Sequence, residues 1–175
     1  MKNFGCLEDS KNFGKNNLSD FEIRRFEKHI GYSLPDDYKN FLKHWRGGYL
    51  DDSVIFKLNY DPTNQEQFYR GESAGIEAIF GLNSDSDYSL YEYFKRYCLD
   101  QNRMMPGMIP IGNDAGSNNT CILLTKEKFG QIFFWDHNWE IDFDDPEEAH
   151  EAFRNCYWIA DSFSEFANSL SLLED

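Results

Sequence analysis

The sequence predicts an α+β fold: two N-terminal helices, a central mostly antiparallel sheet flanked by helices, and a C-terminal helix. Helical periodicity marks both ends of the chain, short apolar segments occupy the middle, and no regular βαβ alternation appears. The chain has 175 residues, of which 41% are hydrophobic and 17% aromatic, enough for one globular domain. We expect a short N-terminal tail over residues 1–17 and a single domain over residues 18–175.

Two helices are predicted at the start of this domain. The first begins with a capping box formed by Ser19 and Glu22, and it ends at Gly31. The second begins near Pro35, which suits a first helical turn, and it ends at Gly47-Gly48. Apolar residues at helical spacing mark the buried faces: Ile23, Phe26 and Ile30 in the first helix, and Tyr38, Phe41, Leu42 and Trp45 in the second.

The middle of the chain is predicted to form the sheet. Six segments have strand character: 53–58, 75–82, 108–112, 120–124, 131–136 and 157–160. The fourth and fifth segments are joined by a turn that contains Gly130, so they form a hairpin. Both faces of this hairpin are apolar. Its strands therefore belong in the middle of a sheet that is covered, at least in part, on both sides.

Two further helices complete the prediction. The first covers residues 88–100, where Leu90, Tyr91 and Phe94 have helical spacing. The last helix begins with a second capping box, Ser162 and Glu165. Its predicted buried side consists of Phe163, Phe166, Leu170 and Leu173.

The charge of the chain limits its partners. There are 31 Asp and Glu residues against 17 Lys and Arg, which gives a formal net charge of −14. Such a chain repels nucleic acid and anionic membranes, and it attracts a basic partner at a raised association rate. The alternative interpretation is an acidic surface that serves solubility alone.

The sequence predicts a cytoplasmic protein. It contains no apolar run of about 18 residues, as a transmembrane helix requires, and no apolar region typical of a secretory signal. The four cysteines form no C-x-x-C pair, and Cys98, Cys121 and Cys156 lie in apolar surroundings. We therefore expect reduced, buried thiols.

Two motifs resemble functional sites but lack the context that those sites need. GESAG, at residues 71–75, matches the nucleophile elbow of serine hydrolases around Ser73, but a polar segment precedes it and a strand-like segment follows it. GNDAGSNN, at residues 112–119, resembles an anion-binding loop, but it leads into a strand, and Asp114 would repel phosphate. We expect the first match to be accidental and the second segment to form a tight turn.

Acidic and histidine residues also gather near the end of the predicted sheet. Asp136, His137 and Glu140 lie close together in the sequence, and Glu147 and His150 have the Glu-x-x-His spacing. A di-iron bundle needs a second copy of that motif and further Glu residues. We expect no catalytic residue, no metal, no cofactor and therefore no enzyme.

The densest acidic run is EIDFDDPEE, at residues 140–148, and it is the best candidate to meet a basic surface. The simpler interpretation is a solvated loop and helix start, where carboxylates favour the first turn. Aromatic neighbours would act as anchors, because interface hot spots are rich in aromatic residues. The predicted partner-binding residues are Asp85, Asp87, Asp114, Trp139, Glu140, Asp142, Phe143, Asp144, Asp145, Glu147 and Glu148.

Several segments occur together in a familiar order. The chain has a Glu near a Gly, then LPDDY, then a helix followed by a Gly pair, and later IPIGNDAGSNNTCILL, GQIFFWDHNWE and IADSFSEFANSL. From about Leu18 to Leu170 this order resembles the SUKH superfamily, the Smi/Knr-type immunity proteins of bacterial polymorphic toxin systems. The matching N-terminal positions are Glu27, Gly31, Leu34, Pro35, Asp37, Tyr38, Leu42, Gly47 and Gly48. The family often has a further Gly where Ser117 stands here.

The resemblance implies an immunity protein that binds a cognate toxin domain and neutralises it by masking its surface. Toxins of such systems are often nucleases, which are basic, so the resemblance and the net charge point to the same kind of partner. The Gly-Asn-Asp loop and the Trp-Asp-His stretch would then define the fold and not a catalytic centre. The alternative is a non-catalytic regulatory or scaffold protein resembling the glucan-synthesis regulators. The toxin's identity and the oligomeric state do not follow from the sequence.

Overall fold

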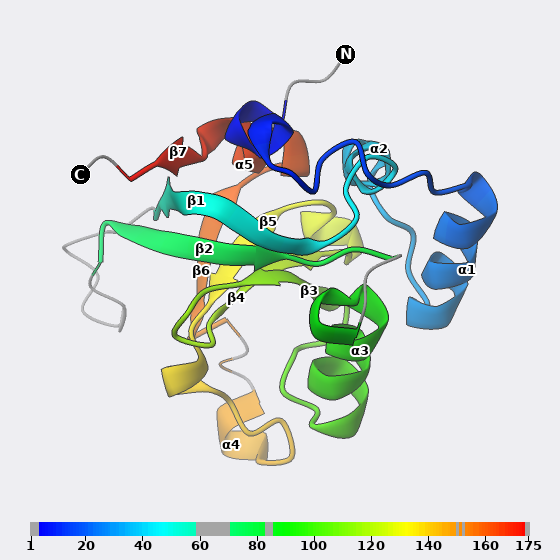
Figure 1. Ribbon diagram of the computed structural model, residues 1–175. Coiled ribbons are helices and arrows are strands. Elements are labelled where there is room, and N and C mark those ends of the chain that lie inside the picture. Colours follow the sequence, from blue (N-terminus) through cyan, green and yellow to red (C-terminus); the bar gives the residue numbers. More distant parts are fainter. Residues whose placement is uncertain (1–3, 59–70, 83–85, 150, 152, 174–175) are drawn as a thin grey trace.

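The computed structural model describes residues 4–58, 71–82, 86–149, 151 and 153–173. Within them, one antiparallel sheet runs through the middle of the molecule in the strand order β6-β5-β4-β3-β2-β1-β7 (Figure 1). The strands are β1 (Gly48–Lys57), β2 (Ser73–Ile79), β3 (Met108–Asn113), β4 (Asn119–Leu123), β5 (Ile132–Trp135), β6 (Cys156–Ala160) and β7 (Ser171–Leu172). The predicted α+β class with a mostly antiparallel sheet is confirmed.

Helices cover both faces of the sheet. The helices are α1 (Asp20–Ile30), α2 (Asp36–Leu42), α3 (Leu90–Phe94), α4 (Pro146–Ala149) and α5 (Phe163–Ser169), with short turns η1 (Gly5–Asp9), η2 (Ser86–Tyr88), η3 (Lys95–Asp100), η4 (Lys126–Lys128) and η5 (His137–Trp139). In Figure 1, α2, α5 and η1 lie above the sheet, whereas α3 and α4 lie below it. Since α5 contacts both β1 and β6, the sheet curls around this helix.

The helix starts follow the signals in the sequence. The Ser19 side chain accepts the backbone N–H of Glu22, and the Glu22 carboxylate accepts the N–H of Ser19, so the capping box of α1 is complete. Gly31 closes α1 with a φ of 79°, which glycine adopts without strain. At the start of α5, Ser162 accepts the N–H of Glu165 at 3.1 Å. The predicted starts of both helices are confirmed.

The second helix ends earlier than predicted, and the reason lies in the N-terminal segment. Asn16 donates its side-chain amide to the carbonyls of Leu42 and Trp45, both at 2.7 Å. These bonds satisfy carbonyls that have no partner beyond the last helical turn. The chain is therefore released from α2 before Gly47, and β1 begins at Gly48 instead of residue 53.

Two hydrophobic cores lie on opposite faces of the sheet. The first core contains the aromatic residues of α2 and α5, among them Phe41 and Phe163 at a ring separation of 4.6 Å. The second core consists of Tyr97, Met104, Met105, Met108, Cys121, Leu123, Phe133 and Trp135. Strand β5 contributes to both, with Phe134 in the first and Phe133 in the second. The prediction that the central hairpin is covered on both faces is confirmed.

Two predicted helical features differ in the structure. The helix expected over residues 88–100 is α-helical only from Leu90 to Phe94 and then widens into the π-helical turn η3, where Tyr93 and Tyr97 stack at 6.0 Å. The prediction that Leu173 belongs to the buried side of the last helix is wrong, because the chain leaves α5 at Ser169 and pairs with β1 as β7. Leu173 is consequently 58% exposed.

One buried carboxylate joins α2 to α5. Asp37 is 7% exposed, and its Oδ1 accepts the N–H of Tyr38 at 2.9 Å while its Oδ2 accepts the N–H of Ser164 at 2.8 Å. Both donors belong to first helical turns, whose N–H groups have no partner within the helix. The Asp of the LPDDY motif therefore satisfies two helix starts that are 127 positions apart in sequence.

We expect Asp37→Ala to lower the free energy of unfolding by about 2–4 kcal/mol, because it leaves buried N–H donors of two helices without acceptors. The matched control is Asp36→Ala. Asp36 is highly exposed and pairs with Lys39, so its loss costs below about 1 kcal/mol. Urea denaturation followed by circular dichroism measures both. Equal losses for the two variants would contradict the assigned role of Asp37.

Candidate partner-binding surface

The acidic segment 140–148 is held against the second core by its apolar residues. Ile141 is buried, and Phe143 is half-buried against the second core. In Figure 1 this segment and α4 lie on the same side of the sheet as α3. Phe143 is thus a packing residue as well as a predicted anchor, whereas Trp139 is 43% exposed.

The carboxylates of the segment differ in how they are engaged. Asp142 accepts the N–H of Asp144 at 2.9 Å, and Asp145 accepts the N–H of Glu147 at 2.8 Å at the start of α4. Asp144 and Glu147 are exposed, and neither carboxylate forms an ion pair with a described residue. These two side chains are available to a partner without cost to the local structure.

Two arginines neutralise the edges of the segment. The guanidinium of Arg103 donates to the Glu140 carboxylate, with Nε at 2.7 Å from Oε2, and lies over the rings of Tyr97 and Trp135 at 4.8 and 5.2 Å. Arg154 pairs with Glu148 at 3.5 Å and with Glu151 at 2.8 Å. Glu140 and Glu148 are therefore engaged within the molecule, and these two ion pairs hold both ends of the segment.

The Asn-Asp-Gly segment is a closed turn, as predicted. The Asp114 carboxylate accepts both the backbone N–H and the side-chain amide of Asn118, each at 2.8 Å. The side-chain oxygen Oδ1 of Asn118 in turn accepts the backbone N–H of His137 at 3.1 Å and lies 2.9 Å from the His137 Nδ1. The loop is thereby fastened to η5, next to Trp139. The charge of Asp114 is directed into the turn and not toward a partner.

Exposed aromatic residues that sequence reasoning missed lie near the same edge of the sheet. Phe153 and Trp158 are 41% and 37% exposed, and Trp158 pairs in register with Phe133 of β5. The rings of Phe153 and Phe133 are 5.7 Å apart, with Lys128 Nζ 5.4 Å from the first. The sequence marks Trp158 only through the alternation of β6, in which its neighbours Tyr157 and Ile159 are buried.

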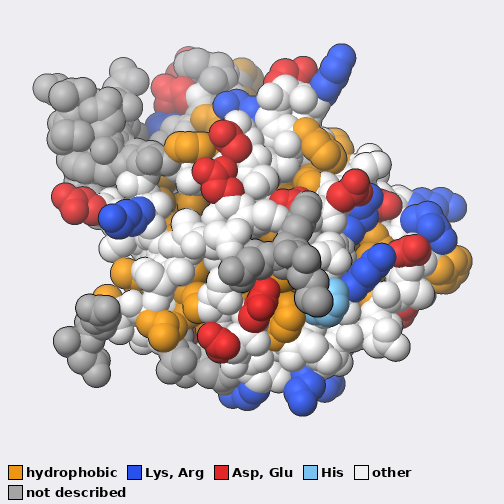
Figure 2. Space-filling model, turned by 90° about the horizontal axis from the view of Figure 1, so that it is seen from above, with side chains coloured by type: hydrophobic (Ala, Val, Ile, Leu, Met, Phe, Trp, Pro, Cys, Tyr) orange, Lys and Arg blue, Asp and Glu red, His pale blue; other side chains and the backbone are white. Residues whose placement is uncertain are grey.

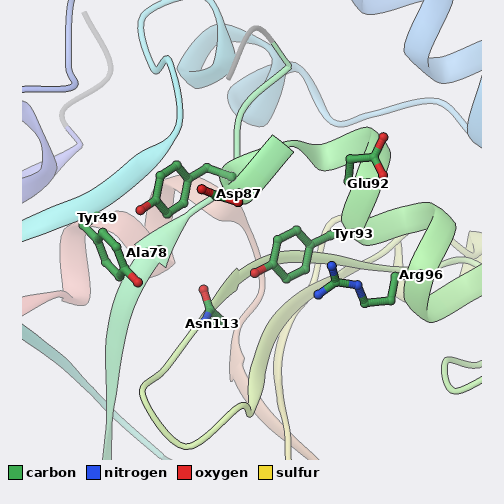
Figure 3. Close-up of a pocket in the computed structure, with 8 residues that line it drawn as sticks. Tyr49, Ala78, Asp87, Glu92, Tyr93, Arg96 and Asn113 are labelled. Atoms are coloured by element: carbon green, nitrogen blue, oxygen red, sulfur yellow. The ribbon is translucent and has the colours of Figure 1, made fainter. Parts of the chain in front are cut away.

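The remaining predicted residues lie farther along the sheet. Asp85 is outside the described residues. Asp87, in η2, is exposed and lines a pocket of about 360 Å³ between α3 and the strands β1, β2 and β3. The structure thus brings residues 139–148 together, with Asp114 turned inward nearby, and places Asp87 at a separate pocket on the α3 side (Figure 3).

The serine, the metal-binding residue types and the thiols that could act in catalysis are not arranged as catalytic sites require. Ser73 opens strand β2 and pairs with Lys57, whereas a nucleophile elbow needs a turn from a strand into a helix. In the part of the chain that the structure describes, no three His, Cys, Asp or Glu side chains converge as metal ligands do. Burial raises the pKa of the Cys98 and Cys156 thiols to about 12, so they stay protonated at neutral pH.

Charge is distributed unevenly along the chain. Residues 1–46, which include α1 and α2, carry nine Lys and Arg against seven Asp and Glu, whereas residues 47–175 carry eight against 24. Figure 2 looks onto the α2 and α5 side and shows Lys and Arg side chains interspersed with Asp and Glu. The excess of negative charge therefore belongs to residues 47–175. None of the helices in the described ranges has the length and apolar character needed to cross a membrane.

Ser117 has a left-handed backbone with a φ of 68°. At this position the SUKH pattern described above often has glycine. We expect Ser117→Gly to raise the free energy of unfolding by about 0.5–1 kcal/mol, because the steric penalty of a Cβ disappears. Ser117→Ala keeps that penalty and should bring no gain. Urea denaturation of the three proteins decides this, and a loss of stability in the glycine variant would contradict the interpretation.

The ion pair between Arg103 and Glu140 should keep the acidic segment in one conformation. We expect Arg103→Met to lower stability by about 1–2 kcal/mol and to speed hydrogen exchange of the amides of residues 141–149, because Glu140 loses its charged partner. Arg96→Met is the control, since Arg96 also lies over a tyrosine ring but pairs with no described carboxylate. Unchanged exchange in the Arg103 variant would show that apolar packing alone orders the segment.

Comparison with known proteins places the chain in a family. The SMI1 / KNR4 family (SUKH-1) matches residues 17–169. The chain is also similar to the SPbeta prophage-derived uncharacterized protein YokK of Bacillus subtilis (strain 168), with 31% identity over 156 residues that cover 85% of this chain and 72% of that protein. The family match spans α1, α2, the strands β1 to β6 and α5. The chain belongs to the SMI1 / KNR4 (SUKH-1) family.

Proposed function

We propose that this chain is an immunity-type protein that binds a basic toxin domain in the cytoplasm and masks its surface without performing chemistry. The observation that carries the proposal is the clamped acidic segment, in which Asp144 and Glu147 are exposed and form no ion pair with a described residue. Trp139, just before this segment in the chain, is exposed as well. Exposed carboxylates and an exposed aromatic ring suit a basic protein surface, because aromatic anchors supply affinity and charges supply orientation.

A basic nuclease fits this surface better than a neutral partner does. Nucleases carry Lys and Arg where phosphates bind, and an acidic protein competes for those same groups. The uneven distribution of charge along the chain supports a basic partner that faces the part outside residues 1–46, since the excess of Asp and Glu lies there. Association would then be fast at low salt and slower as ions screen the charges.

The function is tested in two steps. The tagged protein is used to capture partners from its source organism at low and at raised salt, and each captured protein is then expressed alone in a bacterial host. The proposal expects one basic protein that stops growth by itself, and growth that returns when this chain is co-expressed. Captured proteins that are harmless when expressed alone would favour the regulatory or scaffold alternative and overturn immunity.

A double variant tests whether the acidic segment speeds association with the partner. We expect Asp144→Asn with Glu147→Gln to slow association with the captured toxin about three- to tenfold at low salt, and to leave stability unchanged. The matched control is Asp9→Asn with Glu127→Gln, which removes the same charge from exposed positions outside the segment. Biolayer interferometry measures the rates. An equal effect of both pairs would mean that net charge alone matters and that the segment is not the interface.

A further inference from the structure

The turn between β3 and β4 has a buried polar base that its own hydrogen bonds leave incomplete. Asp114 and Asn118 close the turn itself, whereas Asn113 ends β3, Asn119 begins β4, and the two lie directly opposite each other. Asn119 is 0% exposed, and neither its side-chain oxygen nor its side-chain nitrogen has a hydrogen-bond partner among the described residues. The side-chain oxygen of Asn113 is also buried and unpartnered.

The register of the sheet places these atoms on the α3 side. Residues directly opposite each other in an antiparallel pair share one face of the sheet. Asn119 lies opposite Asn113 on one side and opposite Trp135 on the other, and Trp135 belongs to the second core. The ring of Tyr97 in η3 meets that of Trp135 edge to face at 5.9 Å. The Asn119 side chain is therefore enclosed on a covered face of the sheet, where bulk solvent does not reach it.

The two asparagines do not satisfy each other. The Asn113 amide nitrogen donates to the Asp114 carbonyl at 3.2 Å, so only its oxygen is left for a further bond. The Cβ atoms of opposite residues lie about 4.5–5.5 Å apart. A water molecule joins polar atoms about 5–6 Å apart through two hydrogen bonds, which suits groups on such a pair. Buried polar groups that lack a protein partner are commonly satisfied in this way.

The three atoms select a small group that both donates and accepts. They are two acceptor oxygens and one amide donor. A metal cation cannot accept the amide N–H, an anion without protons cannot donate to the oxygens, and the enclosed position excludes a larger solute. We propose that one ordered water molecule is bound between Asn113 and Asn119, donates to both side-chain oxygens and accepts the Asn119 amide. This water completes the base of the GNDAGSNN turn, whether or not the chain binds a toxin.

Asn113 also gives this site a route to solvent. It lines the pocket of about 360 Å³ beside α3, and Figure 3 shows the hydroxyl end of Tyr93 turned toward the same space. A movement of the Asn113 side chain therefore exchanges the bound water with the pocket, and the strands need not unfold.

The first test is a crystal structure of the whole chain at a resolution that shows ordered water. We expect a density peak about 2.7–3.2 Å from both side-chain oxygens and from the Asn119 nitrogen. A direct hydrogen bond between the two side chains, or a site without a peak, would overturn the proposal. Asn119→Leu removes two of the three polar atoms at a similar side-chain volume, and the peak should then be absent. A peak that persists at the same place in this variant would show that other groups hold the water.

The second test detects the water in solution through Overhauser spectra of the whole chain. We expect cross-peaks between water and the Asn119 side-chain amide protons, with the sign of a long-lived bound water. The matched control is Asn155, which is 1% exposed and donates its amide directly to the Asp136 carbonyl at 2.9 Å, so its protons should show none. Tyr93→Phe removes a hydroxyl proton that could relay the signal, and the cross-peaks should remain. Equal cross-peaks from both asparagines, no cross-peak from Asn119, or their loss in the Tyr93 variant would contradict a bound water.

Discussion

The fold depends on one carboxylate that joins the two ends of the chain. Asp37 accepts N–H groups from the first turns of α2 and α5, and it does so from a buried position. Around this tie the rings of Phe41 and Phe163 pack at 4.6 Å, so the two helices close the first core as one unit. Since α5 also contacts both β1 and β6, the same tie keeps the sheet curled.

The opposite face of the sheet carries the second core. On this side the sheet is covered by η3 and by the segment that ends in α4. Arg103 joins these two covers, because its guanidinium lies over Tyr97 of η3 and reaches Glu140 at the start of the acidic segment. The exposed carboxylates Asp144 and Glu147 belong to this cover, and the pocket at Asp87 lies between α3 and the strands β1, β2 and β3. The structure therefore separates the groups that hold the fold from most of those that are free to meet a partner.

The sequence predicted the elements whose signals are local. The capping box at Ser19, the side-chain cap of α5 by Ser162, and the two-faced hairpin around Gly130 rest on residues close together in the chain. The early end of α2 could not be predicted, because it depends on Asn16, which is distant in sequence and carries no motif. The exposed position of Leu173 follows from β7 pairing with β1, a contact that helical periodicity cannot indicate.

The candidate site also combines features that local sequence predicts with features that depend on contacts between distant residues. A run of carboxylates at residues 140–148 is visible in the sequence, but which of them are engaged depends on arginines 37 and 14 positions away from Glu140. The pocket was missed altogether, apart from Asp87. Tyr49, Tyr93 and Asn113 come from separate elements, and the curl of the sheet brings them together. No spacing rule links such residues, so only the fold can reveal them.

The acidic segment would act early in the binding of a basic partner. Asp144 and Glu147 are exposed, so their field reaches into solvent and acts on an approaching basic protein before contact, within a Debye length of about 8 Å at physiological salt. Such charges govern mainly the association rate. Selection of one partner over another must then come from side chains that contact the partner directly, because general attraction to a basic surface does not distinguish between basic proteins.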